Sequence, residues 1–397
     1  MEWNQSFAAR TKLMRRSAVR ELLKFATQPE VISFAGGLPA AELFPVDEIR
    51  QAAERVLSER GPAVLQYGDT EGILPLRDWI ARQYPASLGV RRENVMIVSG
   101  AQQGLDLIGR VFLNEGDRVL VENPTYLALL SAWRPLGVEF VPIAADEEGF
   151  QIEGIKAALS PHPKLIYSVP NFQNPSGATL SLARRQALVS LAEGHGVIVV
   201  EDDPYGALRY SGQALPSLLE LAAGGPGGLE NCPVVQVGTF SKVLSPGLRI
   251  GWIVAAEAVI NRLGLAKQAM DLHTGTLSQW IVYETVSTGF LDTHVPHLRL
   301  QYRIRRDTML AALDAHMPAG VTWTRPAGGM FLLVRLPESI QAREVLERCL
   351  ANQVAFVPGE EFHLNGLGKH TMRLNFTNAR PEYIGEGIRR LAQALRG

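Results

Sequence analysis

The sequence predicts an α/β fold, with a mostly parallel sheet in a large domain and a smaller α+β domain after it. Short β-branched runs alternate with longer amphipathic stretches between about residues 95 and 252, which is typical of βαβ units. These runs are continuously apolar, as expected for strands that are buried on both faces of a sheet. After Ala256 the pattern changes to long helical segments and two further strand-like runs.

Each part of this fold is assigned to a stretch of the chain. The strands of the large sheet are expected at residues 95–98, 118–121, 165–169, 197–200 and 234–237. The smaller domain is expected to contain strands at 330–334 and 373–377 and a closing helix at 381–395. We therefore predict an N-terminal arm and helix over residues 1–45, a large domain over 46–290 and a small domain over 291–397.

Composition narrows the class of protein. The 397 residues include 39 Lys and Arg against 40 Asp and Glu, so no strong field attracts nucleic acid. No apolar run approaches the ~20 residues that span a bilayer. The N-terminus lacks the apolar stretch of a secretory signal, and an Arg-rich transit peptide is the alternative for this segment. Cys232 and Cys349 are too few for a disulfide framework. We expect a cytoplasmic protein that binds small molecules, with no nucleic-acid or membrane partner.

Polar segments follow the five strand-like runs, at the sheet edge where ligands gather in open α/β folds. Residues 99–103 join a strand to a helix expected to start near Gln103, and the small residues there favour a phosphate or simply form an N-cap. Tyr126 either stacks on a flat ring or packs under a loop. Asn174 precedes Pro175 in a turn, and its amide can donate to a phenolate oxygen or have no role beyond that turn. The glycine-rich residues 222–228 are expected to form a surface loop; no Lys-Ser or Lys-Thr follows them, so they do not fit a P-loop.

Asp202 and Tyr205 come just after a buried strand. A carboxylate there is costly unless it meets a positive partner, and a protonated pyridine nitrogen would be one. A metal cluster of Glu201, Asp202 and Asp203 is the alternative, but no histidines stand nearby at metal-site spacing. We therefore expect no metal, and expect Glu201 and Asp203 to support their neighbours or cap a helix.

Lys242 ends the last polar segment, after the small hydroxyl residues Thr239 and Ser241. Arg249 stands seven positions further on. An amine nucleophile beside a phosphate clamp fits this arrangement, whereas the alternative for a single lysine is a solvated surface charge.

The ordered set Asn174-Pro175, Asp202-x-x-Tyr205, Ser241-Lys242, Arg249 and Arg373 resembles the fold-type I, class I aminotransferases that depend on pyridoxal 5'-phosphate (PLP). The resemblance covers almost the whole chain. It implies that Lys242 holds PLP as a Schiff base and moves the proton, that Asp202 pairs with the pyridine nitrogen, and that Tyr205 contacts the ring oxygen. Lys242, Asp202 and Tyr205 are thus the catalytic residues that it implies.

The same resemblance implies the remaining cofactor contacts and the assembly. The further cofactor residues are Gly100, Ala101, Gln102, Tyr126, Asn174, Thr239, Ser241 and Arg249, together with Tyr67 from the neighbouring subunit. Thr239 departs from the pattern, since many relatives have Ser there, but both residues supply a hydroxyl. A homodimer with shared active sites follows from the place of Tyr67.

Substrate contacts are also implied by resemblance. Arg373 would bind the substrate α-carboxylate as a bidentate clamp. Residues 17–23, 33–39 and 66–72 look like the 2-aminoadipate aminotransferases of lysine biosynthesis, in which a mobile N-terminal helix carries an arginine that meets the side-chain carboxylate. Arg20 occupies that place, and its alternative is an exposed helix charge. The predicted substrate-binding residues are Ser17, Arg20, Gly37, Asn174 and Arg373.

The expected reaction is ping-pong exchange of an amino group between 2-aminoadipate and 2-oxoglutarate. The alternatives within the fold are a broad-specificity aromatic or branched-chain enzyme, a kynurenine-type enzyme, and another PLP activity such as a β-lyase or decarboxylase. A non-enzymatic PLP-binding regulator is the alternative from another class. It would need a basic DNA-reading domain of about a hundred residues, and only about thirty residues precede Ser33.

Overall fold

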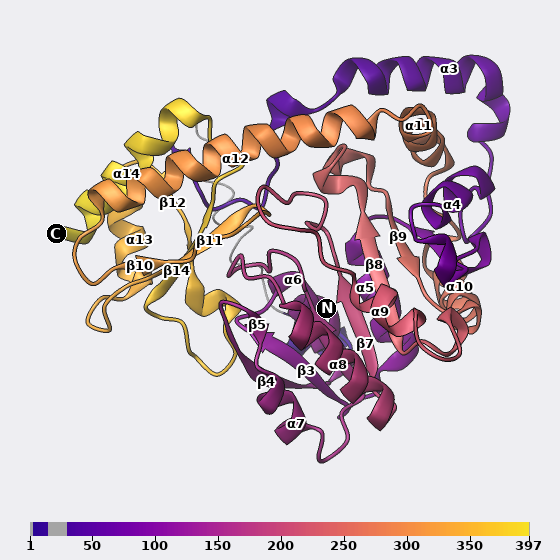
Figure 1. Ribbon diagram of the computed structural model, residues 1–397, viewed down its shortest axis with the longest axis horizontal. Coiled ribbons are helices and arrows are strands. Elements are labelled where there is room, and N and C mark those ends of the chain that lie inside the picture. The colour runs from indigo at the N-terminus through magenta and orange to yellow at the C-terminus, as the bar shows by residue number, and fades with distance from the viewer. Residues whose placement is uncertain (1–2, 15–29, 397) are drawn as a thin grey trace.

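The structure, a computed structural model, describes residues 3–14 and 30–396. The largest sheet within these residues has eight strands in the order β2-β9-β8-β7-β6-β3-β4-β5 (Figure 1). The strands are β2 (Val95–Val98), β3 (Arg118–Asn123), β4 (Glu139–Asp146), β5 (Gly149–Phe150), β6 (Leu165–Ser168), β7 (Ile198–Asp202), β8 (Val234–Thr239) and β9 (Gly251–Val254). Strands β4, β3, β6, β7 and β8 are paired in parallel, while β9 runs antiparallel to both of its neighbours. The predicted, mostly parallel α/β sheet is confirmed.

All five runs that were expected to form strands do so, as β2, β3, β6, β7 and β8. Strands β4, β5 and β9 were not predicted from the sequence. Strand β4 is half-exposed along most of its length and contains Pro142, which is tolerated near a sheet edge, so it lacks the continuous apolar pattern of a buried strand. Strand β9 begins with Gly251 and Trp252 directly after the polar segment that ends at Arg249, so it lacks a continuous β-branched run.

Helices cover the two faces of this sheet. The helix expected near Gln103 is α5 (Ala101–Phe112), which begins two residues earlier than expected and packs on β8 and β9. Val237 of β8 faces α5, whereas its neighbour Gln236 turns to Glu201, which contacts α9 (Leu218–Ala223). Because successive strand residues point to opposite faces, α5 and α9 lie on opposite sides of the sheet.

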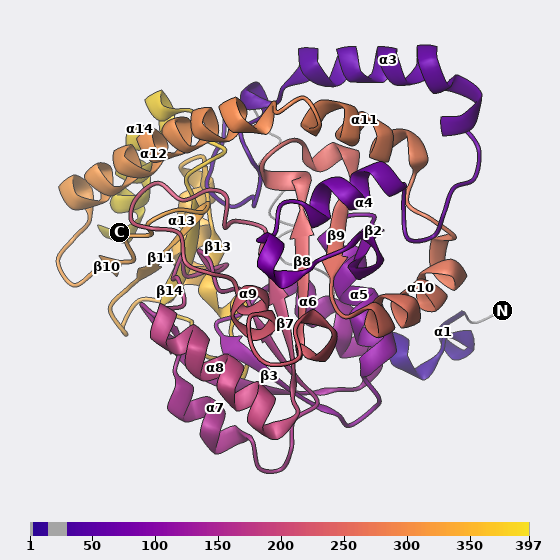
Figure 2. The same cartoon turned by 45° about the vertical axis from the view of Figure 1, so that its right-hand side comes forward.

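The other helices of this part group around these two. On the α5 side lie α6 (Leu127–Trp133) and α10 (Glu257–Asp271), and next to α9 lie α8 (Leu182–His195) and α7 (Ile152–Ala158). Helices α3 (Val46–Val64), α4 (Leu74–Ala81) and α11 (Thr276–Val286) pack together at one end, and the short α1 (Trp3–Ser6) lies beyond α10 (Figure 2). The loop expected at 222–228 overlaps the end of α9.

A second sheet lies beside the first and is antiparallel throughout. Its strand order is β10-β11-β14-β13, with β10 (Thr322–Trp323), β11 (Phe331–Arg335), β13 (Val357–Pro358) and β14 (Thr371–Asn375). The helices of this part are α12 (Leu291–His316), α13 (Ala342–Ala351) and α14 (Pro381–Arg396). Both predicted strands and the closing helix are present, each within one or two residues of the expected bounds. The exact domain boundaries stay a prediction.

Two further features bear on the site. The segment after the undescribed residues 15–29 forms β1 (Ile32–Ser33), which pairs in parallel with β12 (Val354–Ala355). This part of the chain therefore lies beside the C-terminal part that contains the second sheet. The helix expected over 17–23 lies outside the described residues. Among residues 3–14 and 30–396, no helix is both long and apolar enough to cross a membrane.

Candidate active site

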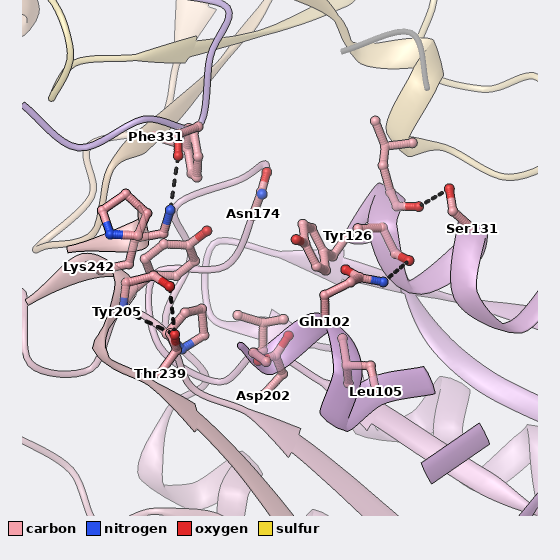
Figure 3. Close-up of a pocket in the computed structure, with 18 of the residues that line it drawn as sticks. Gln102, Leu105, Tyr126, Ser131, Asn174, Asp202, Tyr205, Thr239, Lys242 and Phe331 are labelled. Carbon is pink, nitrogen blue, oxygen red and sulfur yellow. Dashed lines mark hydrogen bonds between the residues drawn. The ribbon is translucent and has the colours of Figure 1, made fainter. Parts of the chain in front are cut away.

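A pocket of about 870 Å³ lies where the carboxyl ends of β7 and β8 meet the second sheet (Figure 3). It brings together residues that are far apart in the sequence, from Gly37 to Arg373. The sequence-predicted residues that line it are Gly37, Ala101, Gln102, Tyr126, Asn174, Asp202, Tyr205, Thr239, Ser241, Lys242, Arg249 and Arg373. The polar segments that follow the strands therefore do converge at one place.

Lys242 is the last residue of η7 (Phe240–Lys242), the short turn that follows β8. Its Nζ donates to the carbonyl oxygen of Gly37 at 3.0 Å. Burial, together with the nearby charges of Arg373 and Arg249, lowers the pKa of Lys242 to about 8. A larger share of the amine is therefore neutral near pH 7 than for an exposed lysine, which suits a nucleophile.

Asp202 ends β7 and is only 3% exposed. Its Oδ2 accepts a hydrogen bond from the Tyr167 hydroxyl at 2.7 Å, whereas Oδ1 is buried with no partner among the described residues. Burial raises the pKa of Asp202 to about 7. An unpaired carboxylate oxygen on a pocket wall is costly by itself, and a cationic ring nitrogen placed against it would restore the ionised form.

Arg373 reaches the pocket from β14. It donates through Nη1 to Asn174 Oδ1 at 2.9 Å and through Nη2 to the Ala35 carbonyl at 2.5 Å. The guanidinium carbon lies 4.3 Å from the ring centroid of Phe331 and 4.8 Å from that of Phe362. Burial lowers its pKa to about 10, and Nε has no partner among the described residues. These contacts fix the plane of the fork, and each terminal nitrogen keeps a second N–H that it can donate to an anion.

Tyr126 and Tyr205 lie in the same pocket as Asn174. Burial raises the pKa of Tyr126 to about 12 and raises that of Tyr205 further, so both hydroxyls stay protonated near neutral pH. The ring of Tyr205 meets Phe331 edge-on, with centroids 5.9 Å apart. Two protonated phenols and an amide can therefore surround the edge and face of a flat ligand.

The start of α5 meets Arg249 at the other end of the pocket. Gly100 has φ +80°, and a Cβ on it would lie 2.2 Å from Arg249 Nη2, so a larger side chain there would strain the backbone and displace the guanidinium. Arg249 Nη2 donates to the Ser99 carbonyl at 3.2 Å. The hydroxyls of Thr239 and Ser241 also line the pocket. A helix N-terminus, a guanidinium and two hydroxyls form a cradle that suits a phosphate, and with Asp202 they fit a phosphorylated pyridine.

Some predicted residues lie elsewhere. Tyr67 is 77% exposed and is not part of the pocket; its ring meets His273 edge-on at 5.8 Å. Ser17 and Arg20 lie outside the described residues. Glu201 is not a pocket residue either: its carboxylate accepts from the backbone amides of Leu218 and Leu219 and thereby caps α9.

Several residues of the site were not predicted from the sequence. Tyr167 supports Asp202, and its signal was a hydroxyl group that, with that of Ser168, stands in a buried strand. Phe331 and Phe362 flank Arg373, but they come from the second sheet and from η9 (Gly359–Phe362), and no local pattern connects them to the site. The pocket also extends along α6, where Ser131 lies opposite Gln102, whose Nε2 donates to the Ala128 carbonyl at 3.1 Å (Figure 3).

Comparisons with known proteins agree with this geometry. The family model for class I and II aminotransferases matches residues 29–391. Aromatic-amino-acid aminotransferase 1 of Thermococcus litoralis is 44% identical, over 100% of this chain and 95% of the relative. The 2-aminoadipate transaminase of Thermus thermophilus is 43% identical, over 100% of this chain and 98% of the relative. The crystal structure of LysN, the α-aminoadipate aminotransferase of Thermus thermophilus, superposes with a TM-score of 0.93 at 43% identity, covering 100% of this chain and 99% of that one.

Proposed function

Because this chain belongs to the class I and II aminotransferases and its cofactor is PLP, we propose that it moves the amino group between 2-aminoadipate and 2-oxoglutarate. The observation that carries this choice of substrate is the whole-length similarity to the Thermus 2-aminoadipate transaminase, at 43% identity and without large unmatched segments on either side. The likeness of residues 17–23, 33–39 and 66–72 to such enzymes also supports it.

PLP, when bound, supplies an electrophilic carbon and a ring system that accepts electrons. Lys242 is proposed to hold the cofactor and to carry the proton to and from the substrate Cα, because its lowered pKa leaves part of the amine unprotonated. Asp202 is proposed to keep the ring nitrogen protonated through its unpaired Oδ1.

Arg373 is proposed to bind the substrate α-carboxylate. Asn174 and Ala35 each accept one hydrogen from a terminal nitrogen and hold the guanidinium in place, and each of these nitrogens keeps a second N–H for the carboxylate. The rings of Phe331 and Phe362 exclude water around the guanidinium, which strengthens its attraction for an anion. The α-carboxylate would thus be oriented before the proton moves at Cα.

A second candidate is an aromatic or broad-specificity aminotransferase. The 44% identity to the Thermococcus aromatic-amino-acid enzyme over the whole chain favours it to a similar degree. The Thermus enzyme was itself solved with a phosphopyridoxyl adduct of leucine, an apolar amino acid. Acidic and apolar donors therefore both belong in the test.

Steady-state rates with 2-oxoglutarate as acceptor separate the two candidates. The donors to compare are 2-aminoadipate, glutamate, leucine, phenylalanine and kynurenine. We expect kcat/KM for 2-aminoadipate to exceed that for phenylalanine and kynurenine by about tenfold or more, which corresponds to one well-formed charged contact. A preference for phenylalanine or kynurenine would reject 2-aminoadipate as the main donor and favour the second candidate.

We also propose that the chain forms a homodimer in the cytoplasm. Leu65, Tyr67 and Leu272 are 70%, 77% and 50% exposed, and Tyr67 contacts His273, the residue after Leu272. Exposed apolar side chains therefore stand on both of these segments, where a second copy could cover them. Tyr67 would then reach the phosphate end of the neighbouring site. The low cysteine count supports a reducing compartment.

A further inference from the structure

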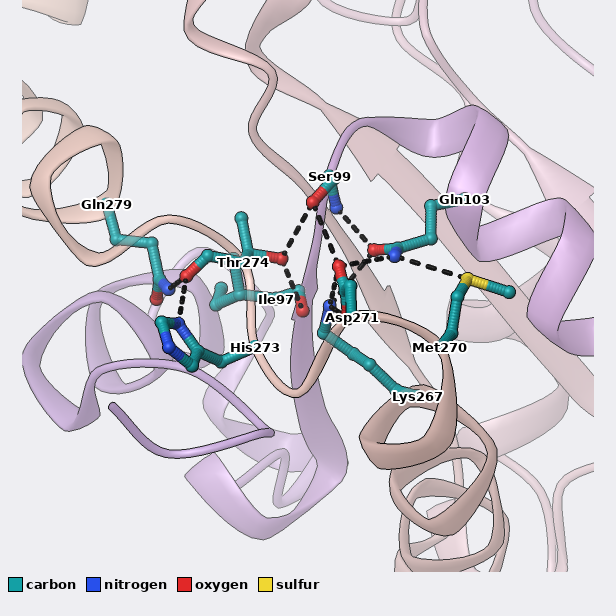
Figure 4. Close-up of polar contacts among 9 residues, drawn as sticks. All are labelled: Ile97, Ser99, Gln103, Lys267, Met270, Asp271, His273, Thr274 and Gln279. Carbon is teal, nitrogen blue, oxygen red and sulfur yellow. Dashed lines mark hydrogen bonds and ion pairs between the residues drawn. The ribbon is translucent and has the colours of Figure 1, made fainter. Parts of the chain in front are cut away.

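A polar network lies directly behind the turn that begins α5 (Figure 4). This Lys267 network consists of Lys267 and Asp271 on α10, Gln103 in the first turn of α5, and Ser99 just before α5. Lys267 is absent from the residues that line the pocket. The reaction described above therefore leaves this lysine without a role.

Lys267 is fully buried, with a side chain that is 0% exposed. Its Nζ donates to Asp271 Oδ1 at 2.8 Å and to Gln103 Oε1 at 3.0 Å. Burying an ammonium group costs free energy, and Lys267 could form the same ion pair with Asp271 on the surface of α10 without that cost. We therefore connect the burial of Lys267 with its contact to Gln103 of α5.

The network sets the orientation of the Gln103 amide. Gln103 Oε1 accepts from Lys267 Nζ and also from the backbone amide of Ser99 at 2.7 Å, while Nε2 donates to Asp271 Oδ2 at 2.6 Å. With the amide reversed, its NH₂ group would face two donors and its oxygen would face a carboxylate. The ammonium and the carboxylate thus allow one orientation, which is the one that holds the Ser99 amide.

Ser99 is held on several sides. Its Oγ lies 3.3 Å from Thr274 Oγ1 and 3.4 Å from Asp271 Oδ2, and its carbonyl accepts from Arg249. The next residue, Gly100, packs directly on the same guanidinium. The position of the turn relative to Arg249, and hence the shape of the phosphate cradle, depends on the contacts that Ser99 makes.

We propose that the Lys267 network positions the Ser99–Gly100 turn and thereby sets the affinity of the protein for the phosphate group of its cofactor. Lys267 acts through Gln103 and Ser99, so it is a positioning residue. The inference concerns cofactor retention and does not depend on which amino acid is the substrate.

The test compares PLP with pyridoxal, which lacks the phosphate. Cofactor is removed from the full-length wild-type protein and from Lys267→Met, which keeps much of the side-chain volume but removes the charge. The dissociation constants of both compounds are then measured from their absorbance changes on binding. The matched control is Lys156→Met, which removes an exposed lysine that is likewise paired within one helix, to Glu153 at 2.8 Å.

We expect Lys267→Met to weaken PLP binding by about tenfold, the effect of one charged hydrogen bond, and to leave pyridoxal binding within about twofold. Lys156→Met should change neither. Equal weakening for PLP and pyridoxal would mean that Lys267 only supports the general structure, and unchanged PLP binding would mean that the turn does not need it. Either result overturns the proposal.

Gln103→Met provides an independent variant in case Lys267→Met does not fold. It breaks the link to Ser99 but leaves the ion pair between Lys267 and Asp271 intact within α10. The same selective loss of PLP affinity is expected, with a thermal unfolding midpoint close to that of the wild type. A Gln103→Met protein that binds PLP and pyridoxal as the wild type does would reject the network as a determinant of the cradle.

Discussion

Asp202 shows how a single residue is prepared for a ligand, with one oxygen held by Tyr167 and the other unpaired. Asp202→Asn should fold, because the amide oxygen can still accept from Tyr167, but it removes the charge proposed to face the ring nitrogen. We expect kcat to fall by about a hundred- to a thousandfold. Tyr167→Phe, which removes only the supporting bond, should cost less. Wild-type turnover by Asp202→Asn would show that another group holds the ring nitrogen.

Glu122 is a buried carboxyl group outside the pocket, 1% exposed on β3 and bonded to the Ser168 hydroxyl at 3.0 Å. Burial raises its pKa from 4.5 to about 8. Because the folded state binds this proton more tightly than the unfolded chain, the contribution of Glu122 to stability is complete below pH 4.5 and is lost as the pH rises through about 8. Glu122→Gln, which cannot ionise, should therefore lose less stability than the wild type between pH 5 and pH 8.5.

Thermal unfolding midpoints at several pH values test this prediction. The unfolding midpoint of Glu122→Gln minus that of the wild type should increase as the pH rises. Glu148→Gln changes an exposed side chain near the surface and serves as the control. If the two variants show the same pH dependence relative to the wild type, Glu122 does not titrate in this range.

Arg20 lies outside the described residues, so its role stays a prediction from the sequence. A guanidinium fork matches the distal carboxylate that 2-aminoadipate and 2-oxoglutarate share. Arg20→Ala should lower kcat/KM for 2-aminoadipate by about ten- to a hundredfold, while leucine should be affected far less. The neighbouring Arg16→Ala is a control for loss of charge from the same segment. Equal losses for leucine and 2-aminoadipate would count against a contact with the side-chain carboxylate.

At the scale of elements, the six-residue helix α9 depends on a residue from another element. Glu201 of β7 accepts from the amides of Leu218 and Leu219 at 2.9 and 3.0 Å, and Ser217 caps the same end through the Glu220 amide. Two amides that α9 itself cannot satisfy are thereby paired inside the protein.

Removing this cap should destabilise the protein. Glu201→Ala would leave the amides and Gln236 Nε2 without their acceptor, so we expect a loss of about 2–4 kcal/mol in the free energy of unfolding, measured by denaturant titration. Ser217→Ala removes a single capping bond from the same helix and should cost about 1 kcal/mol. A smaller effect for Glu201→Ala than for Ser217→Ala would show that water replaces the carboxylate.

At the scale of the whole molecule, shared active sites can be tested by complementation. Lys242→Ala and Tyr67→Ala, co-expressed with different tags, give a hybrid dimer in which one site has both native residues if Tyr67 serves the neighbouring subunit. The hybrid should then show about half of the wild-type activity at limiting PLP, far above either homodimer. If Tyr67 acts within its own chain, neither site of the hybrid is native, and its activity cannot exceed that of the Tyr67→Ala protein.

The sequence by itself determined the features that are encoded locally. The buried strands are continuous apolar runs that can be recognised in the sequence. Polar segments follow these runs and therefore lie at the carboxyl ends of the strands, as do the segments that end at Tyr205 and Lys242. A parallel sheet brings these ends to one edge, so the candidate site could be assembled before any contact was known.

Only the tertiary structure decided which side chains meet across long distances in the chain. The contact of Tyr167 with Asp202, the two phenylalanine rings that flank Arg373, and the burial of Lys267 against Gln103 each join different elements. The half-exposed β4 and the short β9 were likewise recognisable only beside their partner strands. Local patterns report burial and periodicity along one element, whereas these contacts depend on the packing of one element against another, which leaves no periodic trace in the sequence.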